Sequence, residues 1–212
     1  MISDVSLKKQ VLVQLLYSEI FRHPLTGPEL QKFVPAISGE QDRILAELTR
    51  SGLIGEQNGF YYVFDASNKI SEREKGMQRA EQNLAKAFRI ARFIYKFPFV
   101  KGVGISGSLS KGILHEDGDF DYFIITRQNR LWIARTLLVL YKKMFLLNSR
   151  KYFCVNYFVD DISLEIHEKN RFTATEICTL IPVAGSVFHD FYKKKRMDPH
   201  LFSDRRNAAS VT

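Results

Sequence analysis

Two aspartates separated by one residue stand at the start of an apolar run near the middle of the chain. Asp119 and Asp121 precede the run Tyr-Phe-Ile-Ile-Thr at residues 122–126, which is typical of a buried strand. Residues i and i+2 of a strand point to the same face, so both carboxylates would lie on one side. Hard divalent cations such as Mg²⁺ prefer carboxylate ligands. The spacing therefore predicts a metal site made by Asp119 and Asp121.

A glycine and a serine end the preceding apolar run. Residues 100–105 are apolar and β-branched, which predicts a strand, and Gly107-Ser108 predicts a turn at its end. Glycine lets the backbone approach a phosphate closely. The N–H groups around Gly107 and Ser108 can form an anion-binding nest, with the Ser108 hydroxyl as a further donor. Lys111 is a candidate triphosphate contact, with ordinary surface charge as the alternative. Two metal ions beside such a site could clamp the attacking and leaving oxygens of a phosphoryl transfer.

This order of strand, Gly-Ser, loop and Asp-x-Asp strand resembles the active-site hairpin of the nucleotidyltransferase superfamily, the DNA polymerase beta-like fold. Here ten residues separate Gly107-Ser108 from Asp119. A bacterial subgroup with an N-terminal winged helix is also similar, through an Arg-Leu-Trp-x-x-Arg helix, a Cys-x-Asn-Tyr strand and an Ala-x-Glu-Ile helix. The matching segments of this chain are residues 130–135, 154–157 and 174–177. The resemblance covers most of residues 7 to 183.

The resemblance implies a fold, an activity and cofactors. The fold would be α/β (α+β): a nucleotidyltransferase-like mixed sheet with helices, preceded by a small winged-helix domain. The activity would be metal-dependent transfer of a nucleoside monophosphate from a triphosphate, such as ATP, to a hydroxyl acceptor that the sequence does not identify. Asp119 and Asp121 would hold Mg²⁺ or Mn²⁺, and Gly107, Ser108 and Lys111 would bind the nucleotide. The alternative is a catalytically degenerate protein that acts as a nucleotide-, DNA- or protein-binding module.

Active members of the superfamily usually place a third Asp on an adjacent strand, where it binds one metal and helps to deprotonate the acceptor hydroxyl. In the matching strand of this chain, residues 151–159, the only interior polar residue is Asn156. An amide oxygen can coordinate a metal but cannot act as a base, and a buried amide that satisfies backbone groups is an equally good interpretation. Asp160, Asp161 and Glu165 follow nearby as substitutes. The candidate catalytic residues are Asp119, Asp121, Asn156 and Glu165.

A rival motif fails on its context. Gly102, Gly104 and Gly107 spell G-x-G-x-x-G. In a dinucleotide site these glycines follow a strand and open a helix, whereas here they lie within the predicted strand itself. The sequence therefore does not predict a dinucleotide site.

The first 66 residues predict three helices and a hairpin that turns at Asn58-Gly59. This order resembles a winged helix, whose third helix often enters the major groove of DNA. The third helix here, residues 40–50, carries three acids against two arginines, whereas a phosphate-facing helix should be more basic. Packing or homo-oligomer formation is therefore the favoured role of this segment, and DNA binding is the alternative.

The chain divides into a winged-helix-like domain (1–66), a connecting helix (67–98), a nucleotidyltransferase-like domain (99–202) and a polar tail (203–212). We expect the sheet of the third segment to carry helices on one side. Within the second segment, an amphipathic helix should cover residues 72–97 and end at Pro98.

Composition narrows the partners. The formal net charge of +8 favours polyanions, including nucleotides and nucleic acid. Cys154 and Cys178 stand in apolar runs with no metal-ligand residue at short spacing, which predicts buried free thiols in a reducing compartment. No signal peptide and no apolar stretch of membrane-spanning length is visible. We therefore expect a cytoplasmic protein with no membrane partner.

Overall fold

The computed structural model describes residues 4–34, 37–64, 67–146, 151–162, 164 and 171–194. Helices and strands mix along the chain, which confirms the predicted mixed α and β class at this coarse level. The chain forms two compact units, residues 1–75 and 76–212. The division falls inside the helix that the sequence predicts as a connector.

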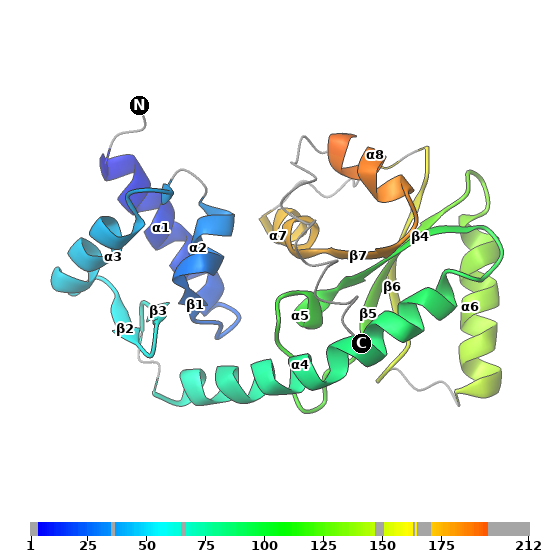
Figure 1. Cartoon of the computed structure of the whole chain (residues 1–212), viewed down its shortest axis with the longest axis horizontal. Helices are drawn as coiled ribbons and strands as arrows, with labels where there is room; N and C mark the ends of the chain where they lie inside the picture. The colour runs from blue at the N-terminus through cyan, green and yellow to red at the C-terminus, as the bar shows by residue number, and fades with distance from the viewer. Residues whose placement is uncertain are drawn as a thin grey trace. The chain divides into compact units, whose positions relative to one another are not determined.

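The first unit combines three helices with a small sheet (Figure 1). Its elements are α1 (Asp4–Glu19), β1 (Leu25–Thr26), α2 (Gly27–Phe33), α3 (Gln41–Arg50), β2 (Gly55–Gln57) and β3 (Phe60–Tyr62). The strands are antiparallel in the order β1-β3-β2. Asn58 and Gly59 both have positive φ, as the two central residues of a tight hairpin turn require. The predicted hairpin is therefore confirmed.

The second unit is built on one four-stranded sheet. Its elements are the part of α4 (Ser67–Ile94) that follows Lys75, then β4 (Val100–Ser106), α5 (Gly107–Ser110), β5 (Asp121–Thr126), α6 (Leu131–Phe145), β6 (Cys154–Asp160), α7 (Arg171–Thr179), β7 (Ile181–Ala184) and α8 (Val187–Lys194). The strand order is β6-β5-β4-β7, with β5 and β6 parallel and the other pairs antiparallel. The predicted pairing of residues 100–105 with 122–126 is confirmed.

Helices cover both faces of this sheet, so the expectation of helices on one side is wrong (Figure 1). Tyr122 and Ile124 of β5 belong to a core shared with α4 and α6. Phe123 and Ile125 belong to a second core, in which Phe191 of α8 packs against Phe123. The run of apolar residues in β5 already carries this information, because a strand buried on both faces is apolar at every position.

Two glycines of β4 make room for the second core. A Cβ atom on Gly102 would lie 2.8 Å from a methyl group of Val187, and one on Gly104 would lie 3.1 Å from Leu180. The G-x-G pattern is therefore explained by close packing against β4. None of the helices in the described part of the chain is long and apolar enough to cross a membrane.

Candidate metal and anion site

Three potential metal ligands converge where β5 and β6 begin. Asp121 is the first residue of β5, Asp119 precedes it, and Cys154 is the first residue of β6. A carboxylate oxygen of each aspartate and the Cys154 sulfur all lie within 4.8 Å of one another. The two acids therefore act from one side, as their spacing predicts, and a thiol joins them from the neighbouring strand.

A buried phenylalanine fixes the two acids. Phe120, between them, is fully buried, and its ring meets Tyr152 edge-on with 5.2 Å between centroids. Its N–H donates to the carbonyl of Lys151, and its carbonyl accepts from the N–H of Cys154, each at 3.1 Å. Because residues i and i+2 share a face in extended backbone, anchoring Phe120 inward turns Asp119 and Asp121 to the other side.

Negative charge accumulates at this point. The pKa of Asp121 is raised by burial and by the charges of Asp119 and Glu176, against a hydrogen bond from Cys154 and the attraction of Lys111. The pKa of the Cys154 thiol is raised to about 12 by burial and by its contacts with Asp121 and Asp119. A cation bound among these groups would relieve the repulsion between the carboxylates.

Gly107 touches the acid pair from β4. It follows Ser106, which pairs directly with Asp121, and its φ is 66°. A Cβ atom at this position would overlap the Asp121 carboxylate and lie 3.0 Å from both Cβ and Cγ of that residue. Glycine is needed here for two separate reasons, the left-handed backbone and the close approach.

A carboxylate occupies the place expected for a phosphate. The N–H of Gly107 donates to Oε2 of Glu176 at 3.2 Å, and the Lys111 ammonium forms an ion pair with Oε1 of the same group. Lys111 also donates to the Gly107 carbonyl at 3.0 Å. The structure therefore gathers two of the predicted phosphate ligands, Gly107 and Lys111, around one anion. Ser108, next to Gly107, is half-buried.

Asn156 lies on β6 beside this group. The register of β5 and β6 shifts between Tyr122, which pairs with Val155, and Phe123, which pairs with Tyr157. Asn156 is the extra residue at this irregularity. It is exposed, and together with Glu176 it helps to line a hollow of about 210 Å³.

The remaining carboxylate candidates lie elsewhere. Asp160 pairs with Thr126, at the opposite end of β5 from Asp121, and accepts a hydrogen bond from the N–H of Asn129. Five residues of strand span roughly 16 Å, so neither Asp160 nor the following Asp161 is close to the acid pair. Glu165 lies outside the described residues.

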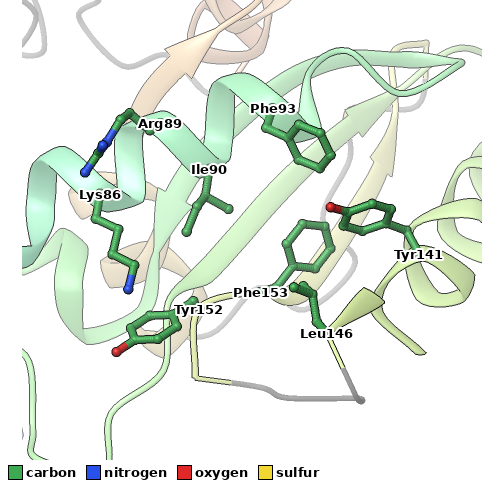
Figure 2. Close-up of a pocket in the computed structure, with 8 residues that line it drawn as sticks. All are labelled: Lys86, Arg89, Ile90, Phe93, Tyr141, Leu146, Tyr152 and Phe153. Carbon is green, nitrogen blue, oxygen red and sulfur yellow. The ribbon is translucent and has the colours of Figure 1, made fainter. Parts of the chain in front are cut away.

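A second hollow, of about 460 Å³, opens near the acids (Figure 2). It is lined by Lys86, Arg89, Ile90, Phe93, Tyr141, Leu146, Tyr152 and Phe153. The Lys86 ammonium lies 3.2 Å from the centre of the Tyr152 ring. The other side of Tyr152 meets Phe120, so this aromatic, basic hollow is linked to the acid pair through two packed rings.

Two site residues were not predicted from the sequence. The sequence pattern predicts a ligand-free thiol at Cys154, because no metal-ligand residue is close along the chain, yet the fold brings two carboxylates to it. Glu176 has no predicted role. Both residues stand in segments that carry the family resemblance, the Cys-x-Asn-Tyr strand and the Ala-x-Glu-Ile helix.

Comparisons of the chain with models of protein families, with curated proteins and with solved structures found no match. Function is therefore argued from the geometry of the site.

Proposed function

We propose that the second unit is a nucleotidyltransferase of the DNA polymerase beta-like fold, which transfers a nucleoside monophosphate from a triphosphate such as ATP to a hydroxyl acceptor. The observation that carries the proposal is the convergence of Asp119 and Asp121 beside Gly107 at the end of β4. The acids follow a Gly-Ser turn on the neighbouring antiparallel strand, in the order that the superfamily resemblance implies.

Asp119 and Asp121 would hold Mg²⁺ or Mn²⁺. The donor set fits a divalent cation, because two carboxylates share one side and the pKa of Asp121 is raised partly by its neighbour's charge. The bound ion would neutralise charge on the phosphates and on the leaving oxygen. Phe120 holds the acids in place, which matters because misplacing reacting groups by about 1 Å can cost about 10²-fold in rate.

Gly107, Ser108 and Lys111 would bind the triphosphate. A phosphate oxygen would take the positions of the Glu176 carboxylate on the Gly107 N–H and the Lys111 ammonium. Glu176 must then swing away, so nucleotide binding works against an internal competitor. Asn156 and Glu165 remain candidates for the third catalytic position, and with Asn156 alone the acceptor hydroxyl would lack a base.

A second candidate function is a degenerate site that binds nucleotide without transfer. It is favoured by the ion pair of Glu176 with Lys111, which already satisfies the charge that would attract a phosphate. The first unit would then act through its surface as a winged helix, in homo-oligomer formation or in DNA binding.

Ion pairs on α3 favour oligomer formation over DNA binding. Arg43 is bound to Asp4, Glu40 and Glu47 at once. Lys8 is bound to two of the same acids. These cations are therefore already neutralised, whereas phosphate contacts need exposed positive charge.

Triphosphate binding is the first test of the proposal. Mg²⁺ with a non-hydrolysable triphosphate, present at about a hundred times its dissociation constant, should stabilise the chain by roughly 2.7 kcal/mol. The double variant Asp119→Ala with Asp121→Ala should lose this effect, because both metal ligands are gone. The measurement is the thermal unfolding midpoint with and without ligand.

A matched double variant controls for the loss of two negative charges. Asp117→Ala with Asp190→Ala removes two exposed acids from the same unit. This protein should keep the full ligand effect. Equal stabilisation of wild type and of the Asp119/Asp121 variant would place the ligand elsewhere and refute the proposed site.

Glu176→Gln should tighten the binding of inorganic tripolyphosphate by about 10-fold. The neutral amide is a weaker partner for Lys111, and a hydrogen bond to a charged group contributes about 1.5–3 kcal/mol; we take the lower end because the pair is partly exposed. Isothermal titration calorimetry without metal measures the affinity directly. Glu116→Gln changes the net charge equally at an exposed position and should leave the affinity unchanged. Weaker binding in Glu176→Gln would mean that the carboxylate helps to hold the ligand.

A further inference from the structure

The three converging donors differ in chemical softness. Asp119 and Asp121 offer carboxylate oxygens, which suit Mg²⁺ and Mn²⁺, whereas Cys154 offers sulfur, which suits softer ions such as Zn²⁺. A pair of carboxylates alone would not distinguish strongly among these ions. The thiol therefore bears on which metal the site selects.

The position of Cys154 is set by the fold. It pairs with Asp121 in the parallel ladder of β5 and β6, so the two side chains leave the sheet side by side. Its N–H is fixed to the carbonyl of Phe120, the residue between the acids. The sulfur lies in contact with both carboxylates. The backbone of the acid pair and that of the thiol are thus held together independently of any ion.

The spacing of the donors fits one ion. Zinc lies about 2.3 Å from a cysteine sulfur and about 2.0–2.2 Å from a carboxylate oxygen, so two ligands of one ion are at most roughly 4.5 Å apart. The three donor atoms here all lie within 4.8 Å of one another. Three protein ligands would leave one tetrahedral position open, as in catalytic zinc sites.

We propose that Cys154 is the third protein ligand of the metal held by Asp119 and Asp121, and that its sulfur makes the site prefer Zn²⁺ or Co²⁺ over Mg²⁺. On binding, the S–H bond breaks, a sulfur–metal bond forms, and the proton passes to the buffer. The inference rests on the metal site of the proposed function, but it concerns the identity of the ligand and not the transfer reaction.

Cobalt reports directly on sulfur ligation. Co²⁺ added to the wild-type chain should give a ligand-to-metal charge-transfer band in the near ultraviolet, which requires a thiolate ligand. Cys154→Ser should abolish the band. Cys178→Ser is the matched control, because Cys178 is the other cysteine of the chain and is also half-buried; this variant should keep the band in full.

Competition gives the preference. Zn²⁺ should displace Co²⁺ and quench the band, whereas Mg²⁺ at the same concentration should not. In Cys154→Ser, Zn²⁺ affinity measured by calorimetry should fall by at least about 10-fold, the smallest loss common for removal of a supporting group around a metal. Mg²⁺ affinity should change little, because magnesium binds through oxygen.

The outcomes separate this inference from the proposed function. Co²⁺ that binds to the wild type without a charge-transfer band would overturn sulfur ligation and leave a carboxylate metal site intact. A band that persists in Cys154→Ser would also overturn it. If neither Co²⁺ nor Mg²⁺ binds to the wild type, both the inference and the proposed metal-dependent function fail.

Discussion

Asp121→Asn is expected to make the metal-free protein more stable at neutral pH and, at the same time, to remove nucleotide transfer. The charged carboxylate is half-buried and is repelled by Asp119 and Glu176, which together with burial raises its pKa. Asparagine keeps the shape and removes the charge, so the repulsion disappears. The same change removes a metal ligand. Loss of one preorganised electrostatic group costs other enzymes about 10²–10³-fold in turnover, and we expect at least that loss here.

The stability difference should depend on pH in a defined direction. Because the pKa of Asp121 is raised on folding, folding favours its protonated form. Its stabilising contribution is therefore present below the unfolded pKa, near 3.8, and is lost as the pH rises through the folded pKa. Asp121→Asn does not titrate, so its advantage over the wild type should grow as the pH rises above 3.8 and then level off. Urea unfolding across a pH series without added metal measures this advantage.

An exposed neighbour supplies the control. Asp117→Asn lies in the same loop but is exposed, so it should change neither the pH dependence nor the transfer of label from a radiolabelled triphosphate. The transfer assay should follow both macromolecular and small-molecule products, because the acceptor is unidentified. An Asp121→Asn protein that is less stable than the wild type and still transfers nucleotide would show that the carboxylate has a structural role only.

Local patterns were enough to predict the hairpin that carries the acids. The apolar strands pair as expected, and Asp119 and Asp121 face one side, because alternation along a strand is a short-range property. The turn at Asn58-Gly59 is equally local. Each of these features depends on neighbours in sequence, which a single sequence displays.

Features that depend on strand register were not predictable in the same way. Cys154 reaches Asp121 only because β6 pairs with β5 in parallel and in this register. Asn156 is displaced from that position by the irregularity at Val155, and no local residue pattern marks the irregularity. Strand β7 was not predicted either. It lies at the edge of the sheet, where Pro182 is tolerated although proline argues against a central strand.

Contacts made by α7 and α8 are also long-range. Glu176 binds Gly107 and Lys111 from a helix far along the chain. The glycines of β4 match the bulk of Phe188 on α8, which becomes evident only when the two segments are packed together. A glycine pattern in one segment and an aromatic pattern in another carry no register by themselves.

Gly107→Ala should disrupt the site more than any other single methyl group in this loop. Alanine in the left-handed conformation costs about 1–2 kcal/mol, and here the new Cβ also overlaps the Asp121 carboxylate. Overpacking of this kind typically adds about 1–3 kcal/mol. Relief requires Asp121 to move, and displacement of a reacting group by about 1 Å can lower a rate by about 10²-fold.

Gly112→Ala separates the backbone cost from the steric clash. Gly112 also has positive φ, at 75°, but a Cβ atom there would meet nothing within 4 Å. Its variant should lose only the backbone part of the stability and keep full metal binding and transfer. The two variants are compared by urea unfolding, by Co²⁺ titration and by the transfer assay. If Gly107→Ala and Gly112→Ala behave alike in all three, the contact between Gly107 and Asp121 has no role in the site. If only Gly107→Ala loses metal binding, the glycine of the Gly-Ser turn is required because it leaves space for the acid.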